Sequence, residues 1–184
     1  MTGERPTRHV VVMGVSGAGK TTVAREISEL TGMTFADADA FHTEEHVALM
    51  RAGIPLDDEA RWPWLRRLSA WMADRCAEGV STVLACSALK RSYRDVLRQG
   101  PPSLDFVHLD GPVEVIRERM AARAGHYMPA SLLESQLATL EPHGPDESVV
   151  VLGVSGTPGE LAAAAVARLG LRPAMSRPPG STRP

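Results

Sequence analysis

Short apolar runs alternate with longer amphipathic stretches along most of the chain. Short runs rich in Val, Leu and Phe are typical of buried strands, whereas apolar residues spaced three or four apart indicate helices. Strands are expected at residues 9–14, 33–37, 81–87, 104–110 and 148–153, of which 33–37 has the weakest pattern. Helices are expected near residues 20–31, 42–52, 61–78, 88–98, 112–124, 130–140 and 158–169. This alternation predicts an α/β fold in which helices cover both faces of a five-stranded parallel sheet.

The two ends of the chain differ in composition from the middle. Residues 1–8 are polar, and residues 172–184 are rich in Pro, Ser and Arg with little that a core could bury. We therefore expect both segments to be disordered and residues 9–171 to form one domain. A length of 184 residues with 43% hydrophobic content suits a single core of that size.

Charge and cysteine content narrow the class of partner. The chain has 20 Lys and Arg against 22 Asp and Glu, so neither nucleic acid nor an anionic membrane is expected as a partner. Its start does not resemble a signal peptide, and no apolar run approaches the roughly 18 residues of a membrane span. Two cysteines and six scattered histidines show no zinc-site spacing. We expect a cytoplasmic protein with small-molecule ligands.

The segment GVSGAGKT, residues 14–21, lies between the first expected strand and the first expected helix. Its spacing is that of a phosphate loop, in which backbone N–H groups wrap a di- or triphosphate and the helix dipole adds positive potential. Lys20 is expected to be catalytic because it reaches the β and γ phosphates, and Thr21 is expected to bind Mg²⁺. The expected ATP-binding residues are Gly14, Val15, Ser16, Gly17, Ala18, Gly19, Lys20, Thr21 and Thr22.

Asp37 ends the second expected strand, and Asp39 and His42 follow it. Ligands of parallel sheets gather at such carboxyl ends. We expect Asp37 to bind Mg²⁺ through water and Asp39 to accept the proton of an attacking hydroxyl group. His42, one helical turn past Asp39, is expected to hydrogen-bond a polar substrate. The alternative is that Asp39 merely caps the helix that begins near Phe41.

Five motifs follow one another along the chain: GVSGAGKTT (14–22), DADAFH (37–42), GIPLDDEARWPWL (53–65), CSALKRSYRDVLR (86–98) and RAGHYMPASLLESQLATLE (123–141). In matching order, from about residue 10 to residue 169, the chain resembles the gluconokinase family. Members of that family are small P-loop kinases, similar in fold to shikimate and adenylate kinases, that use ATP to phosphorylate the terminal hydroxyl of D-gluconate. The resemblance implies a three-layer P-loop kinase fold with a small lid at about 120–140, the same activity, and a homodimer.

The resemblance also implies roles for basic residues beyond the phosphate loop. It makes Arg61 a substrate contact, and Arg61 is expected to begin a helix whose first turn holds Pro63. Lys90 and Arg94 match the family pattern after the third strand, where cations can pair with the carboxylate of a sugar acid. The alternative for these two residues is an exposed amphipathic helix whose basic side chains face solvent.

Arg119 and Arg123 lie four residues apart on one expected helix and therefore share a face. Arg123 leads into a segment bounded by Gly and Pro that suits a moving lid, and it is expected to close over the transferring phosphoryl group as a catalytic residue. Arg119 is expected to contact the nucleotide, and His126 the acceptor.

The chain departs from the family pattern in the segment expected to contact the acceptor. Ala38 stands in place of Gly, His46 and Leu49 stand in place of Asn and Lys, and Ala60 replaces an acidic residue. Phosphorylation of another small hydroxy acid, such as shikimate or a different aldonate, is therefore the alternative activity.

A function without an acceptor is a further alternative. The run FVHLD ends in Asp110, as a strand with a Mg²⁺-binding Walker B aspartate would. With the metal there, the protein would be an ATPase or a nucleotide-dependent regulatory module. We prefer Asp37 and Asp39, because the resemblance to small kinases places the working carboxylates at those positions.

Overall fold

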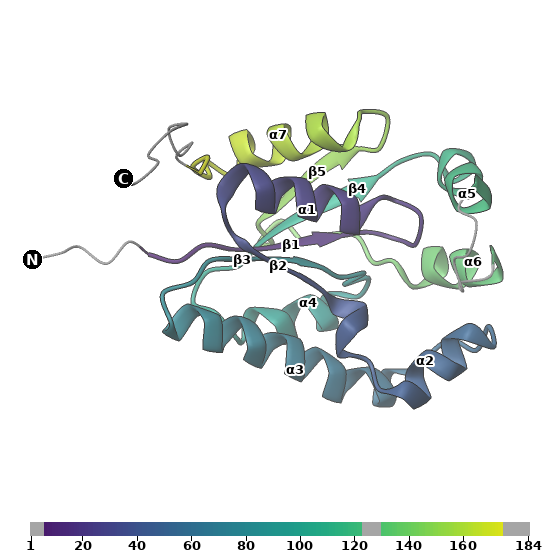
Figure 1. Cartoon of the computed structure of the whole chain (residues 1–184). Coiled ribbons are helices and arrows are strands. Elements are labelled where there is room, and N and C mark those ends of the chain that lie inside the picture. Colours follow the sequence, from purple (N-terminus) through teal and green to yellow (C-terminus); the bar gives the residue numbers. More distant parts are fainter. Residues whose placement is uncertain (1–5, 123–129, 175–184) are drawn as a thin grey trace, which may run out of the picture.

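The computed structural model describes residues 6–122 and 130–174, and its centre is a parallel β-sheet (Figure 1). The strands are β1 (His9–Met13), β2 (Thr34–Asp37), β3 (Thr82–Ala85), β4 (Asp105–Asp110) and β5 (Val149–Gly153). Their order in the sheet is β2-β3-β1-β4-β5, and all neighbouring pairs are parallel. The five strands expected from the sequence are thus confirmed.

Helices cover both faces of this sheet and extend past one end of it. They are α1 (Lys20–Thr31), the short 3₁₀ helix η1 (Ala38–Phe41), α2 (Glu44–Arg51), α3 (Asp58–Ala77), α4 (Arg91–Arg98), α5 (Val113–Ala122), α6 (Ala130–Thr139) and α7 (Pro158–Arg168). Figure 1 shows α1 and α7 on one face and α3 and α4 on the other. The helices α2, α5 and α6 lie beyond the carboxyl ends of the strands. The predicted three-layer α/β fold is therefore confirmed.

The central strand β1 separates two hydrophobic cores. Val10 and Val12 belong to the core beneath α1 and α7, whereas Val11 and Met13 belong to the core against α3 and α4. All four side chains are fully buried, because successive residues of a strand point to opposite faces and helices cover both. This double burial explains why the strand is a continuous apolar run in the sequence.

Strand register brings the chemically active segments to one edge of the sheet. Asp37 at the end of β2 is level with Ala85 of β3, and Ala85 is level with Val12 of β1. The phosphate loop begins two residues after Val12. The loop, the end of β2 and the end of β3 therefore share the carboxyl edge of the sheet.

The helix containing Arg61 begins earlier than the sequence pattern predicted. α3 starts at Asp58, because the Asp57 carboxylate caps it by accepting a hydrogen bond from the Ala60 N–H at 2.8 Å. Pro63 consequently lies inside the helix rather than in its first turn. The capping aspartate, not the proline, sets the helix start.

The folded part also extends past both expected domain boundaries. Arg8 donates hydrogen bonds to the Asp105 carboxylate at 2.8 Å and to the Leu169 carbonyl at 3.0 Å. At the other end, the Ala174 N–H donates to the Leu30 carbonyl at 2.7 Å. The expectation that residues 1–8 and 172–184 lie wholly outside the fold was therefore wrong for Arg8 and Ala174.

Within the described ranges, no helix has the length and apolar character that crossing a membrane requires.

Candidate active site

One cavity at the carboxyl edge of the sheet brings together residues from all five sequence motifs. Its wall includes Ser16, Gly17, Gly19, Lys20 and Thr21 of the phosphate loop, Asp37, Asp39 and His42 after β2, Arg61 and Trp64 of α3, Cys86 and Ser87 after β3, and Gln136 of α6. We call this space the main cavity. The predicted residues of the phosphate loop and of the DADAFH motif thus share one site.

Glycines shape the phosphate loop because side chains would not fit at two of its positions. A Cβ atom on Gly14 would lie 2.7 Å from the Leu109 carbonyl oxygen, and one on Gly17 would lie 2.5 Å from the Met120 side chain. Both glycines also have positive φ angles, 141° and 83°. The loop therefore packs directly against β4 and α5. Lys20 bends back over it, and its Nζ donates to the Val15 carbonyl at 3.0 Å.

The carboxylate of Asp37 joins the phosphate loop to the segment after β2. Its Oδ2 atom accepts a hydrogen bond from the Thr21 hydroxyl group at 2.7 Å, and its Oδ1 atom accepts one from the Asp39 N–H at 3.0 Å. Asp37 is therefore the cap of η1, and Thr43 is the cap of α2. The alternative that Asp39 serves only as a helix cap is excluded for these two helices. The Asp39 side chain is 57% exposed and lines the main cavity.

His42 is a buried imidazole in the wall of the main cavity. Its ring stacks on Trp64 with centroids 4.3 Å apart, and the Trp64 indole N–H donates to the Ala38 carbonyl at 2.8 Å. Burial lowers the pKa of His42 to about 4, so the ring is neutral at pH 7. In the described part of the chain, its Nδ1 atom has no hydrogen-bond partner.

Arg61 presents the predicted cation to the main cavity, and its neighbours hold it in place. Its Nε donates to the Leu56 carbonyl at 3.0 Å, and its guanidinium carbon lies 5.4 Å from the centre of the Tyr93 ring. The Tyr93 hydroxyl donates to Asp58 at 2.5 Å. Arg61 is thus fixed from two sides.

Lys90 lies behind Arg61 rather than in the main cavity. Its Nζ donates to both carboxylate oxygens of Asp58, at 2.8 and 2.9 Å. The hydrogen bond from Lys90, followed by that from Tyr93, lowers the pKa of the Asp58 carboxyl. Lys90 therefore contacts Asp58, and it is absent from the described residues that line the main cavity. The structure does not bring it to the predicted acceptor site.

The prediction that Arg94 binds the substrate is contradicted by its burial. Its side chain has no exposed surface and forms a two-point ion pair with Glu147, at 2.7 and 2.9 Å. It also donates to the carbonyl groups of Ala88 and Leu89. Chiefly because of Arg94, the pKa of the Glu147 carboxyl is held well below its usual range. Arg94 therefore ties the loop after β3 to the segment before β5.

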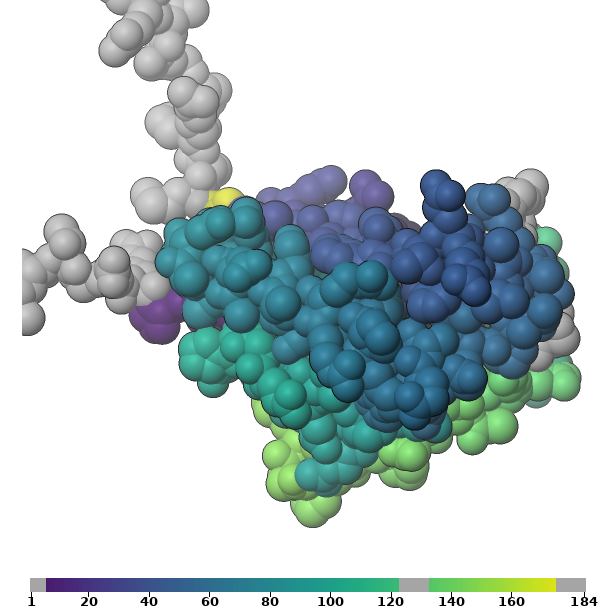
Figure 2. All heavy atoms as spheres, turned by 90° about the horizontal axis from the view of Figure 1, so that it is seen from below, coloured from purple at the N-terminus to yellow at the C-terminus, as the bar shows by residue number. Residues whose placement is uncertain are grey.

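Hydrogen bonds also attach the end of α6 to the start of α4. The Glu141 N–H donates to the Leu89 carbonyl at 2.9 Å, and the Arg91 N–H donates to the Glu141 carboxylate at 2.7 Å. The C-terminal end of α6 is therefore fixed to the loop that Arg94 holds. Figure 2 shows that, on this face, the surface of α2 and α3 adjoins that of the segment around α6.

Arg119 lies in a second cavity on the other side of the phosphate loop. Its Nη2 donates to the Val154 carbonyl at 2.5 Å. The cavity is also lined by Gly17, Ala18, Gly19, Thr22, Val23, Ala122, Gly156, Pro158 and Leu161. Arg119 and Thr22 thus share a space on the loop, as their predicted nucleotide-binding roles require. Arg123 and His126 lie outside the described residues.

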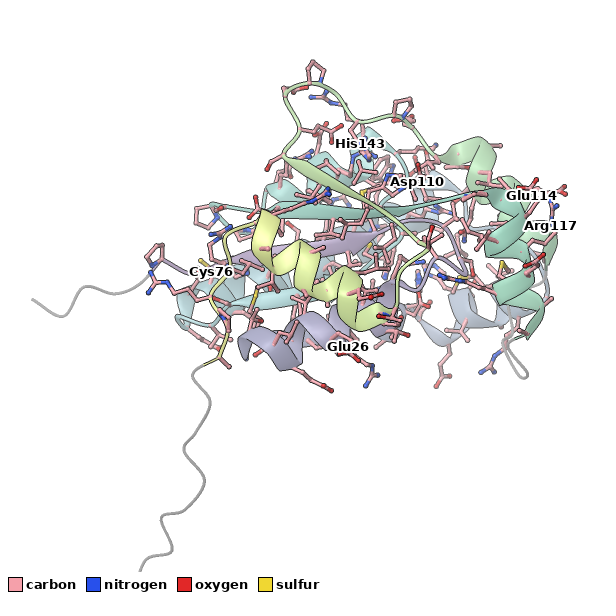
Figure 3. All side chains as sticks on the ribbon, turned by 90° about the horizontal axis from the view of Figure 1, so that it is seen from above. Glu26, Cys76, Asp110, Glu114, Arg117 and His143 are labelled. Atoms are coloured by element: carbon pink, nitrogen blue, oxygen red, sulfur yellow. The ribbon has the colours of Figure 1, made fainter. Side chains whose placement is uncertain are left out.

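The competing metal aspartate, Asp110, occupies a different position. It is the exposed last residue of β4, and its carboxylate accepts the Gly111 N–H at 2.9 Å. Figure 3 labels it close to His143. Among the described residues that line the two cavities, Asp110 is absent. The hydrogen bond between Thr21 and Asp37 therefore favours Asp37 as the metal carboxylate.

Sequence reasoning missed Gln136. The Gln136 Oε1 atom accepts the Ser16 N–H of the phosphate loop at 2.6 Å, although the two residues are 120 positions apart. The helical pattern predicted α6 but offered no signal for this contact. Cys86, directly after β3, is buried, and burial raises the pKa of its thiol to about 12.

Comparisons with known proteins identify the family of the chain. Residues 10–143 match the family model described as AAA domain. A gluconokinase of Gluconobacter oxydans is 48% identical over 143 residues, which cover 78% of this chain and 80% of that protein. Among solved structures, an unliganded sugar kinase from a Janibacter species is 62% identical with a TM-score of 0.87, covering 90% of this chain and 96% of that one.

A solved gluconokinase from Sinorhizobium meliloti provides a further match. It is 45% identical with a TM-score of 0.77, and the alignment covers 90% of this chain and 94% of that chain. Residues 10–143, which match the family model, include the phosphate loop and all described residues that line the main cavity. The chain therefore belongs to the gluconokinase family.

Proposed function

We propose that the protein transfers the γ-phosphoryl group of ATP to the terminal hydroxyl of D-gluconate, giving 6-phospho-D-gluconate. The observation that carries this proposal is the main cavity, in which the phosphate loop faces Asp39, His42 and Arg61. The similarity to a protein named gluconokinase, 48% identical over most of both chains, supports the choice of acceptor.

The phosphate loop and the second cavity suit a nucleotide that lies along the start of α1. Backbone N–H groups of the loop, the α1 dipole and Lys20 supply positive potential for the phosphates. Thr22 and Arg119 then lie toward the nucleoside end, in the second cavity. The γ-phosphoryl group would face the main cavity, where the acceptor binds.

Three side chains of the main cavity provide what a sugar acid requires. Arg61 supplies a cation for the carboxylate of the acceptor. The neutral ring of His42, which lines the cavity, hydrogen-bonds a hydroxyl group. The exposed carboxylate of Asp39 orients the attacking hydroxyl and accepts its proton. Positioning is the larger contribution, because phosphoryl transfer needs little covalent help.

We also propose Mg²⁺ as the cofactor, bound at Thr21 and Asp37. A hydroxyl and a carboxylate 2.7 Å apart are the oxygen ligands that this ion prefers. Within the described part of the chain, no group of three or more His, Cys, Asp or Glu residues could hold a metal. This fits an ion that takes most of its ligands from phosphates and water. When bound, Mg²⁺ would neutralise charge on the β and γ phosphates.

The remaining expectations of the family resemblance are proposals of the same kind. We propose that Arg123 closes over the phosphoryl group, that His126 contacts the acceptor, and that the protein is a cytoplasmic homodimer. Light scattering on the purified protein tests the dimer. A monomer at micromolar concentration would contradict it.

An acceptor panel tests the proposed activity directly. ADP release is measured with gluconate, other aldonates, shikimate and no acceptor. We expect gluconate to give the highest kcat/KM and the reaction without acceptor to be slow. A clear preference for shikimate or another acid would overturn the acceptor assignment, which the substitutions at Ala38, His46, Leu49 and Ala60 make worth testing. Equal ADP release with and without acceptors would indicate an ATPase.

A further inference from the structure

Gln136 connects α6 to the phosphate loop at the boundary of the acceptor space. Its Oε1 atom accepts the Ser16 N–H at 2.6 Å. Ser16 lines the main cavity and is absent from the described wall of the second, nucleotide-side cavity. The contact therefore lies on the acceptor side of the loop.

The Ser16 contact also fixes the orientation of the carboxamide. A backbone N–H can only donate, so the oxygen of the carboxamide, not its nitrogen, must face the loop. The nitrogen Nε2 is then the end directed away from Ser16. A carboxamide nitrogen carries two N–H donors, which can serve two hydrogen bonds at once.

Gln136 also lines a smaller cavity that adjoins the main one. This space lies between α6 and the segment joining α2 to α3, and its wall includes Met50, Pro55, Leu56, Arg61 and Leu89. Arg61 and Gln136 belong to the walls of both cavities. A sugar acid held by Arg61 would therefore lie within the space that Gln136 borders.

We propose that Gln136 is an acceptor-binding residue that positions the sugar acid against the phosphate loop. Its Nε2 donates to an oxygen of the acceptor, while its Oε1 stays on the Ser16 N–H. One side chain thereby sets the distance between the acceptor and the loop that holds the γ-phosphoryl group. This inference rests on the proposed function, because it requires an acceptor in the main cavity.

Two substitutions separate the donor role from the contact with Ser16. Gln136→Glu keeps an oxygen for the Ser16 N–H but loses both donors and adds a negative charge near an anionic acceptor. Gln136→Met keeps the length of the side chain and removes both polar roles. We expect the gluconate KM to rise by roughly 10-fold in Gln136→Met, as for one lost hydrogen bond to a charged or polar group, and further in Gln136→Glu.

Glu134→Gln is the matched control on the same helix. Glu134 is 77% exposed, with a long contact of 3.9 Å to Arg117, so its replacement should leave the gluconate KM within 2-fold. ATP affinity is measured without acceptor for all variants, and we expect Gln136→Met to stay within about 3-fold of the unmodified protein. Thermal melting confirms that each variant is folded.

Each outcome of this experiment decides the proposal. A gluconate KM within 2-fold in both Gln136 variants would overturn it, as would a loss of ATP affinity without a change in the gluconate KM. Unfolding of both variants would also overturn it, by assigning Gln136 to the fold. If the unmodified protein prefers another acid, the proposed function fails, and the same comparison is made with that acid. If no acid is accepted, both proposals fail.

Discussion

Thr21 in the first turn of α1 donates a hydrogen bond from its hydroxyl group to the carboxylate of Asp37 at the end of β2. The distance between Thr21 Oγ1 and Asp37 Oδ2 is 2.7 Å. This bond joins the nucleotide-binding loop to the strand end that also carries Asp39. Asp37 holds both the loop and the backbone N–H of Asp39, whereas the Asp39 side chain is 57% exposed and lines the main cavity. Different surroundings imply different roles, which substitutions can separate.

Replacement of Asp39 by Asn should lower kcat without weakening ATP binding. The variant keeps the size of the side chain but removes the basic carboxylate, for which a loss of roughly 10²- to 10⁴-fold is typical. A loose transition state would keep the loss near the lower limit. Steady-state kinetics and ATP binding measure both quantities. Asp110→Asn, at the end of β4, serves as the control and should leave kcat within 2-fold. Retention of most activity in Asp39→Asn would refute its assignment as the base.

Replacement of Asp37 by Asn should change the response to Mg²⁺. An amide binds this cation less well than a carboxylate does, so we expect a higher Mg²⁺ concentration at half-maximal rate. The measurement is a Mg²⁺ titration at saturating ATP and gluconate. An unchanged titration together with a reduced melting temperature would mean that Asp37 acts only through its hydrogen bonds to Thr21 and Asp39.

Replacement of Lys20 by Ala should reduce turnover by roughly 10²-fold or more, the scale of lost electrostatic stabilisation in a transition state. Lys20 bends over the loop toward the Val15 carbonyl, so the fold should tolerate its removal. Single-turnover kinetics with saturating ATP isolate the chemical step. Normal turnover in this variant would contradict the assignment of the phosphate loop.

Replacement of Arg94 by Met should destabilise the fold and leave the gluconate KM nearly unchanged. Glu147 would become a buried carboxylate without its main partner, a change that costs about 3–5 kcal/mol. Urea denaturation measures the free energy of unfolding. Arg91→Met is the control, because the ion pair of Arg91 with Asp146 is exposed and should contribute little. A large rise in the gluconate KM of folded Arg94→Met would restore the predicted substrate role.

Acidification should destabilise the protein through two buried histidines. Burial lowers the pKa of both His42 and His108 to about 4. In the unfolded chain these rings protonate near pH 6.5, so the unfolded state binds more protons below that pH. The contribution of the two neutral rings to stability is therefore complete above about pH 6.5 and decreases as the pH falls toward 4.

Urea denaturation at several pH values between 7.5 and 5 measures this dependence. We expect the free energy of unfolding to fall with pH, and the slope to be smaller in a His108→Asn variant, which lacks one of the two rings. An identical slope in the variant would contradict the assignment for His108. NMR titration of the imidazole signals provides an independent measurement of both pKa values.

Local signals explain how much of the fold could be predicted. Strand β1 was recognised because both of its faces are buried, which leaves an uninterrupted apolar run from Val10 to Met13. The predicted limits of α1, residues 20–31, agree with the structure, in which Gly19 and Gly32 stand at its two ends in the left-handed conformation. Such signals lie within a few residues of the feature they determine.

The site was predicted only where its residues lie next to such local signals. Asp37 and Asp39 follow a strand end directly, and they do lie beside the phosphate loop. Arg94 was misassigned because its partner, Glu147, lies 53 positions away, and nothing near Arg94 in the sequence indicates a buried ion pair. Gln136 was missed for the same reason. Contacts between distant segments depend on how the helices pack, which the pattern of a single helix does not specify.

The hydrogen bonds of Glu141 with Leu89 and Arg91 fix one end of α6, so a tilt of this helix would turn about that end. Gln136 lies five residues before Glu141, which corresponds to about 7.5 Å along a helix. A tilt of about 10° would move Gln136 by roughly 1.3 Å, enough to lengthen its bond to Ser16 beyond hydrogen-bonding distance. A rotation of α6 about Glu141 would thus break or restore its contact with the phosphate loop.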